Sequence, residues 1–248
     1  MTAIDDVLAD LRAEGDRLEE LLEAVDALGE EGWARASGAP GWSVADVVLH
    51  LAQTEEGVVR TLGRGAGTWT LREGTLDDAV DAQVAAQRGS GSEIGRRWRA
   101  ARLAAITALR AADPDVAVTW AAAPLKPRTL ATTRLAEHWA HALDVADALG
   151  VTLPDTARLR HIAWLGHATL PYALGLAGEL PFPVRAELVG PDGSLWVFGP
   201  ADAADRISGP AGAFCRVGAR RLRAEESGLL SSGPRAGLAL GLLRNYAA

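Results

Sequence analysis

The stretch TTRLAEHWAHALDVADALG, residues 132–150, decides how this 248-residue chain folds and where its chemistry lies. Its pattern predicts one helix that is capped by one of two adjacent threonines and stops at Gly150, because glycine suits the position that follows a helix C-terminus. Glu137 and His141 are four residues apart, so their Cβ atoms lie about 5–6 Å apart on one helix face. A single divalent ion can therefore bridge the two side chains.

A third ligand has to come from elsewhere, and His50 is the natural candidate. It lies in SVADVVLHLAQTEEGVVRTL, residues 43–62, where apolar residues recur at helical spacing. Ser43 is a good N-cap, and Asp46 stands where a capping box has its acid. His50 follows Val47 by three residues and so shares the apolar face of the predicted helix.

Other interpretations of these residues remain open. A lone histidine on an apolar face is most often a hydrogen-bonded core residue, and an E-x-x-x-H match occurs by chance in many helices. His138 is a competing ligand, but it shares a helix face with only one member of the Glu137/His141 pair. Glu55 and Glu56 are predicted to lie on the surface. Asp144 follows His141 by three residues, so it can orient that imidazole.

Further helical patterns cover 3–28, 75–88, 92–112 and 155–179, and a glycine-rich loop covers 63–73. Four or five antiparallel helices in a bundle are the economical architecture, because facing helices can direct ligands from different elements toward one ion. The fold class expected is therefore mainly α.

The pattern changes near residue 180. The segment PFPVRAELVGPDGSLWVFGP, residues 181–200, predicts a hairpin with strands over 184–189 and 195–198 around a Gly-Pro-Asp-Gly turn. Two short helices, beginning near Pro210 and Pro234, and a strand within 222–233 complete a small α+β unit. We expect a helical bundle over 1–180 and this C-terminal domain over 181–248.

Composition narrows the class of protein. The chain is 48% hydrophobic and 23% charged with a formal net charge of −7, which argues against nucleic-acid or anionic-membrane partners. No apolar run is long enough to span a bilayer, and MTAIDD lacks the features of a signal peptide, so a cytoplasmic protein is expected. The single cysteine, Cys215, excludes an internal disulfide. One lysine against many arginines, with abundant alanine and glycine, indicates a GC-rich bacterial source.

Two segments carry a family resemblance: APGWSVADVVLHLAQTEE around His50 and EHWAHALDVADALG around the Glu137/His141 pair. They resemble the DinB/YfiT-like superfamily of metal-binding four-helix bundles. The chain is most similar to the branch of mycothiol-dependent maleylpyruvate isomerase, and within it to uncharacterised actinobacterial metal-binding proteins. The resemblance implies that His50, Glu137 and His141 hold a divalent ion, with a small α+β domain after the bundle.

The resemblance also implies a chemistry. Three protein ligands leave a tetrahedral ion with one open position, typical of a catalytic site. Zinc is the expected ion, and nickel, iron or cobalt suit the same ligands. Mycothiol is the expected thiol cofactor, which the cation's field would favour as thiolate. Asp144 is a candidate catalytic residue, and Arg220 and Arg221 are candidates for cofactor binding, because guanidinium groups suit carboxylates.

We therefore expect a metal-dependent isomerase or thiol S-transferase that acts on a small-molecule metabolite, as a monomer or homodimer. A metal-dependent hydrolase is one alternative, since the same ion could activate water. A non-catalytic protein that binds a metal or a small metabolite is the other.

Overall fold

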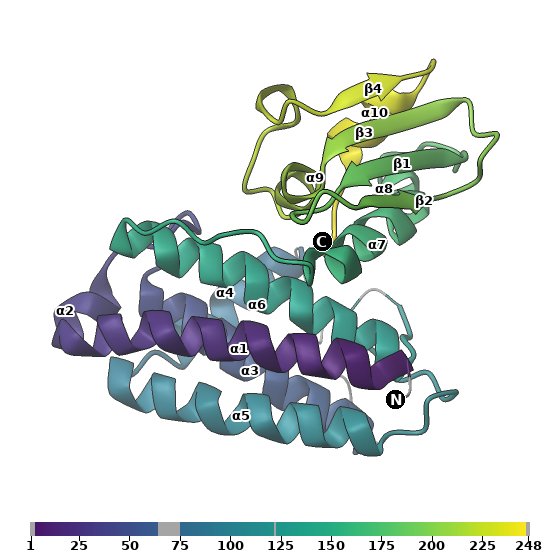
Figure 1. Ribbon diagram of the computed structural model, residues 1–248. Helices are drawn as coiled ribbons and strands as arrows, with labels where there is room; N and C mark the ends of the chain where they lie inside the picture. Colours follow the sequence, from purple (N-terminus) through teal and green to yellow (C-terminus); the bar gives the residue numbers. More distant parts are fainter. Residues whose placement is uncertain (1–2, 64–74, 122, 247–248) are drawn as a thin grey trace. The chain divides into compact units, whose positions relative to one another are not determined.

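The computed structural model describes residues 3–63, 75–121 and 123–246, and the predicted loop over 63–73 lies almost wholly outside them. The described residues form two compact units, one that ends at Leu153 and one over Pro154–Tyr246. The first is helical, and the second combines helices with a small sheet (Figure 1). The expected mainly α class with an α+β part is confirmed. None of the described helices combines the length and the apolar character needed to cross a membrane.

Four long helices form the bundle of the first unit, with two short helices in their connections. The long helices contact one another in the pairs α3 with α5, α1 with α6, α3 with α6 and α1 with α5. The elements are α1 (Ala3–Ala27), α2 (Gly29–Ala34), α3 (Val44–Leu62), α4 (Leu76–Ala86), α5 (Gly91–Ala111) and α6 (Pro127–Leu149).

Helix α3 begins where the sequence predicts. The Ser43 hydroxyl accepts a hydrogen bond from the backbone N–H of Asp46, and the Asp46 carboxylate accepts one from the backbone N–H of Ser43. This capping box satisfies two N–H groups that have no partner within the helix. The Asp46 carboxylate also accepts two hydrogen bonds from Arg88, which fixes the chain before α5 against the start of α3.

Helix α6 starts earlier than expected. It begins at Pro127, which suits a first helical turn because that position needs no N–H donor. Thr132 and Thr133 lie inside the helix, where their hydroxyls donate to backbone carbonyls three or four residues back. The end at Gly150 is as predicted, with φ of 68° in the left-handed region.

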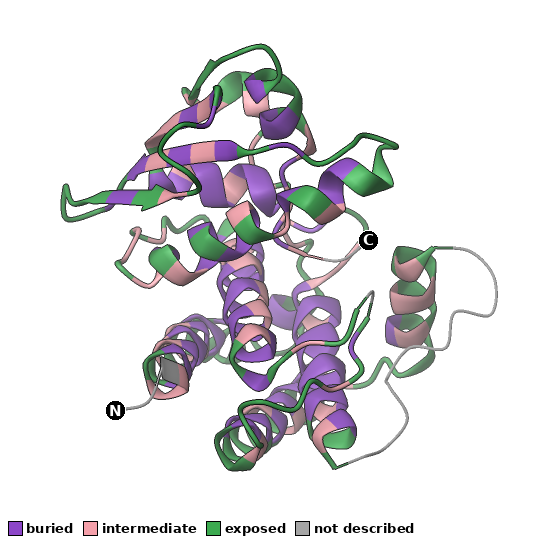
Figure 2. Cartoon of the chain, turned by 90° about the vertical axis from the view of Figure 1, so that its right-hand side faces the viewer, coloured by how far each residue is buried: buried purple, intermediate pink, exposed green. Residues whose placement is uncertain are grey.

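Helices α3 and α6, which carry the predicted ligands, are largely buried. Leu49, Leu51, Leu130 and Leu135 have no exposed surface. By contrast, α4 has one buried residue, Val84, among those described (Figure 2). Ligands on α3 and α6 are therefore held by the core of the bundle.

The second unit contains a four-stranded sheet in the order β2-β1-β3-β4. Strand β1 pairs antiparallel with β2 and parallel with β3, and β3 pairs antiparallel with β4. Its elements are α7 (Leu159–Ala168), α8 (Leu170–Leu176), β1 (Val184–Val189), β2 (Leu195–Phe198), β3 (Asp205–Pro210), α9 (Ala211–Gly218), η1 (Ala224–Glu226), β4 (Leu230–Ser232) and α10 (Ala236–Leu242).

The sequence did not predict β3, because DRISGP has one large apolar residue, Ile207, and no visible alternation. It also predicted one helix over 155–179, which the structure divides at Thr169 into α7 and α8. Helix α7 contacts α9 and β2, and α8 contacts α10. The division between the units therefore falls before Pro154, whereas the change of sequence pattern near residue 180 predicts a later boundary.

Candidate metal centre

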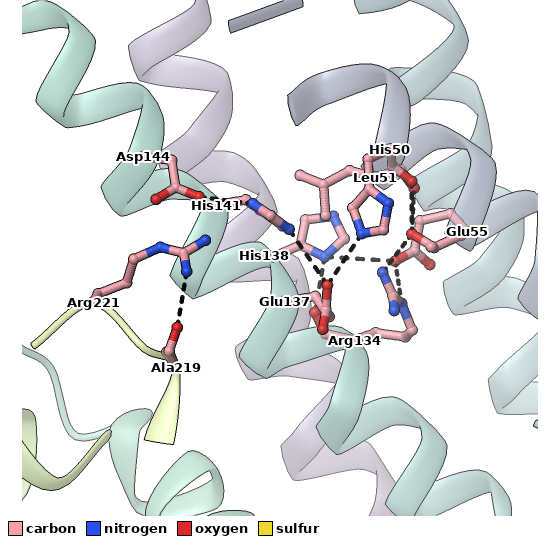
Figure 3. Close-up of polar contacts among 11 residues, drawn as sticks. His50, Leu51, Glu55, Arg134, Glu137, His138, His141, Asp144, Ala219 and Arg221 are labelled. Atoms are coloured by element: carbon pink, nitrogen blue, oxygen red, sulfur yellow. Dashed lines mark hydrogen bonds and ion pairs between the residues drawn. The ribbon is translucent and has the colours of Figure 1, made fainter. Parts of the chain in front are cut away.

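His50, Glu137 and His141 come together in the bundle, one from α3 and two from α6 (Figure 3). The Nε2 atom of His50 lies 3.4 Å from Oε2 of Glu137, and Nε2 of His141 lies 3.5 Å from the same oxygen. One potential ligand atom from each of the three residues lies within 4.8 Å of the others. Within the described ranges, this is the one group of three or more His, Cys, Asp or Glu side chains with such spacing.

These distances suit a divalent ion. Ligand atoms bound at about 2.0–2.1 Å in tetrahedral geometry lie about 3.3–3.4 Å apart, and the two distances to Glu137 match that spacing. The side chain of Glu137 retains 23% exposure, whereas each imidazole retains 10%. The donor set is therefore held by the core but is accessible at the carboxylate.

Asp144 fixes the orientation of His141. Its Oδ2 lies 2.9 Å from Nδ1 of His141, and Asp144 is buried. Because a carboxylate accepts, Nδ1 of His141 carries a proton, and Nε2 is the nitrogen left to bind an ion. This is the arrangement by which a carboxylate orients a metal-binding histidine.

The charge states of two of the three donors, Glu137 and His50, favour cation binding. Burial alone would raise the pKa of Glu137, but hydrogen bonds from His141 and His50 outweigh it and hold the pKa well below its usual value. Burial lowers the pKa of His50, which favours its neutral form. Burial also acts to lower the pKa of His141, but the hydrogen bonds with Asp144 and Glu137 raise it. Glu137 is therefore ionised and His50 neutral, as a divalent ion requires, whereas His141 has to release the proton on Nε2 when an ion binds.

His50 is oriented differently from His141. Its Nδ1 atom is buried and has no hydrogen-bond partner among the described residues. Its ring instead contacts Trp42, with ring centroids 5.2 Å apart, and Trp42 also stacks on His141 at 6.2 Å. The indole Nε1 of Trp42 donates to Asp81 on α4.

Sequence reasoning did not place Trp42 beside the two imidazoles. Its position directly before the Ser43 cap was the available signal. A residue two positions before a helix can pack back over the first two turns, where His50 lies.

His138, the competing ligand, is engaged elsewhere. The indole N–H of Trp98 donates to its Nε2 at 3.2 Å, so Nε2 accepts and Nδ1 carries the proton. That Nδ1 lies 2.9 Å from the backbone carbonyl of Arg134. Both nitrogens are therefore satisfied, and the ring is a buried core residue of the bundle.

The prediction that Glu55 lies on the surface is wrong, because its exposed fraction is 1%. Its carboxylate forms an ion pair with the buried Arg134 of α6 at 2.8 Å. Glu56 is partly exposed and pairs with Arg97 of α5. Helical position alone could not show which acidic residue faces a buried arginine.

Arg220 and Arg221 lie in the second unit, directly after α9. Arg220 has φ of 59° in the left-handed region, where a non-glycine residue is uncommon. One guanidinium nitrogen of Arg221 donates to the backbone carbonyl of Ala219 (Figure 3). A part in cofactor binding stays a prediction for both.

These features define a class: a helical-bundle protein with a three-donor candidate metal site, joined to a small α+β unit. The model of the mycothiol maleylpyruvate isomerase N-terminal domain matches residues 7–146, and the chain belongs to this family.

The chain is also similar to proteins of known sequence or structure. It is 39% identical over 217 residues to uncharacterised proteins of Mycobacterium tuberculosis strains CDC 1551 and H37Rv, covering 84% of this chain and 82% of each relative. Its fold is similar to the crystal structure of the mycothiol-dependent maleylpyruvate isomerase, with a TM-score of 0.65, 15% identity and 93% of both chains covered. A mutant of that enzyme gives a TM-score of 0.64 and 14% identity.

Proposed function

We propose that this protein is a metal-dependent enzyme of the mycothiol-dependent isomerase or thiol S-transferase type, acting on a small-molecule metabolite. The observation that carries the proposal is the donor set of His50, Glu137 and His141, whose spacing fits a tetrahedral divalent ion. Family membership supports the thiol cofactor, since the matching family and the similar solved structures are named for mycothiol.

In this proposal His50, Glu137 and His141 hold the ion, and Asp144 keeps Nε2 of His141 directed toward it. Zinc is the first candidate, followed by nickel, iron and cobalt. When bound, the ion would supply a positive charge that favours the thiolate form of a thiol. The partial exposure of Glu137 supports access for a ligand from solution.

The thiol has to come from outside the chain. Cys215 is the one cysteine of the sequence, and it is buried in the second unit. Burial raises the pKa of its thiol, so little thiolate forms at neutral pH. Arg220 and Arg221 are the residues proposed to bind the cofactor or an anionic substrate, because a guanidinium group pairs well with carboxylates.

The metal site is tested by elemental analysis of the wild-type chain and of His141→Ala. The variant should lose most of its bound metal and keep its helical circular dichroism, because the core of α6 does not depend on this side chain. His161→Ala, in the second unit, is the matched control and should retain metal. A full equivalent of metal in His141→Ala would show that the ligand assignment is wrong.

The thiol is tested with cobalt as the added ion. Mycothiol or a simpler thiol should produce a sulfur-to-cobalt charge-transfer band, and Cys215→Ala should show the same band. If no thiol changes the spectrum and turnover proceeds without thiol, the metal-dependent hydrolase replaces this proposal. If metal binds and no turnover of any kind is found, the chain is a binding protein.

A further inference from the structure

A second group of buried polar side chains lies one helical turn from the candidate ligands. It consists of Arg134 on α6 with Glu55 and Thr54 on α3, and we call it the α3–α6 network. Arg134 is 2% exposed, Glu55 1% and Thr54 4%. Thr54 follows His50 by four residues and Arg134 precedes Glu137 by three, which is about 6 Å and 4.5 Å along the helix axes.

The hydrogen bonds of the network lead to the backbone of His50. Nε of Arg134 donates to Oε1 of Glu55 at 2.8 Å, and Nη2 donates to the hydroxyl of Thr54 at 2.7 Å. That hydroxyl lies 2.9 Å from the backbone carbonyl of His50 and 3.0 Å from that of Leu51, and its single proton can serve either. Arg134 of α6 is therefore connected through Thr54 to the backbone of His50, the candidate ligand on α3. Figure 3 shows Arg134 beside Glu55 near the candidate ligands.

A buried ion pair often adds little to the stability of a fold. The free energy needed to remove both charges from water often exceeds the attraction between them, and apolar replacements are commonly neutral or stabilising. Such a pair can instead fix how two elements register against each other. Here it joins the two helices that supply the three candidate ligands.

His50 is the ligand that needs this support. Asp144 orients His141 directly, whereas Nδ1 of His50 has no partner among the described side chains. The placement of the His50 ring against Glu137 then depends on Trp42 and on the position of its own backbone. We propose that Arg134, Glu55 and Thr54 are positioning residues, which set the backbone of His50 so that its ring meets Glu137 and His141 at metal-binding distance.

This inference rests on the proposed metal site and adds three residues that do not touch the ion. Thr54→Val is the sharpest test, because it removes the hydroxyl and leaves every charge in place. We expect the affinity for cobalt, measured by competition with a chromophoric chelator, to fall about tenfold. This is the lower end of the loss in metal affinity when a side chain that supports a metal ligand is removed. The visible spectrum of the bound cobalt should also change, because the geometry of its ligands changes.

Thr61→Val is the matched control. Thr61 is also buried on α3, and its hydroxyl donates to the backbone carbonyl of Thr119, outside the donor set. This variant should lose comparable stability and keep both the affinity and the cobalt spectrum. Equal cobalt affinity in Thr54→Val and the wild type would overturn the inference, as would an equal loss of affinity in the two threonine variants.

Adjacent glutamates give an independent comparison. Glu55→Gln breaks the pair with α6, whereas Glu56→Gln breaks a pair with α5, which carries no candidate ligand. We expect reduced cobalt affinity in the first variant and wild-type affinity in the second, and the reverse would contradict the inference. If the wild-type chain takes up no divalent ion, the proposed function fails first; if it does and the Thr54 and Glu55 variants match it, only the inference fails.

Discussion

The cores of the two units differ in what they bury. Among the described residues, the bundle unit buries twelve polar or charged side chains, and the second unit buries two, Asp205 and Asn245. The core of the second unit is otherwise apolar and includes Phe214, Ile207 and Leu188. The first group comprises Glu14, Asp46, His50, Gln53, Thr54, Glu55, Thr61, Thr132, Arg134, His138, His141 and Asp144.

The difference indicates where chemistry is concentrated. A buried polar group costs free energy unless it is hydrogen-bonded, so a fold that only needs stability keeps few of them. Six of the twelve in the bundle belong to the candidate ligands, to the orienting Asp144 or to the α3–α6 network. We therefore expect changes at these six residues to alter metal binding and changes in the second core to alter stability alone.

The largest effect is expected for Phe214→Ala in the second unit. Phe214 is 1% exposed, and truncating a buried phenylalanine costs about 3–5 kcal/mol of unfolding free energy. Urea denaturation would measure the loss, and the folded variant should keep its full metal content. Leu195→Ala is the control, because Leu195 is 63% exposed and its loss should cost within about 0.5 kcal/mol. Metal loss in folded Phe214→Ala would break the comparison.

Asp144→Asn tests the core of the bundle, where we expect a change in metal binding. An amide does not hold the proton of His141 Nδ1 as a carboxylate does, and loss of such a partner lowers metal affinity about 10–100-fold. Competition titration would measure this. Asp147→Asn, an exposed position on the same helix, should bind metal as the wild type does. Unchanged affinity in Asp144→Asn would remove the orienting role of this residue.

Asp46 is a buried polar residue of the bundle that caps the start of α3 and lies outside the donor set, so it separates the effects of stability from those of metal binding. Burial acts to raise its pKa, yet hydrogen bonds from Arg88 and Ser43 outweigh it and lower the pKa. Its contribution to stability is therefore present above its unfolded pKa of about 3.9 and is lost as the pH falls through the lower folded pKa.

Asp46→Asn should cost about 1 kcal/mol of unfolding free energy at pH 7, the usual net contribution of a hydrogen bond, because its contacts with Ser43 and Arg88 are weakened. The difference from the wild type should shrink in acid, as measured by denaturation at several pH values. Metal affinity should not change. A difference that is independent of pH would contradict the ionised capping role.

The smallest effect is expected for Cys215. Burial raises the pKa of its thiol, so a thiol reagent should not modify the native protein and should modify one group after denaturation. Cys215→Ala should keep the metal content of the wild type. Rapid labelling of the native chain would show that the second core opens more readily than its packing indicates.

Local sequence determined much of the fold and the candidates for the site. The capping box of Ser43 and Asp46 and the end of α6 at Gly150 depend on neighbouring residues, so they could be predicted. The spacing of Glu137 and His141 likewise follows from one turn of helix. The family resemblance and the apolar face of its helix predicted His50 as the third ligand. In the structure its Nε2 lies 3.4 Å from Oε2 of Glu137.

Only the tertiary structure decided which residues support these candidates. Glu55 and Glu56 are adjacent and chemically identical, and the one that is buried is the one that faces Arg134 across α3 and α6. The sequence also did not predict that Trp42 contacts both imidazoles. Nor did it predict the strand β3 or that α7 and α8 belong to the second unit. Helical periodicity says which side of a helix a residue occupies, but its partner depends on how helices distant in sequence pack together.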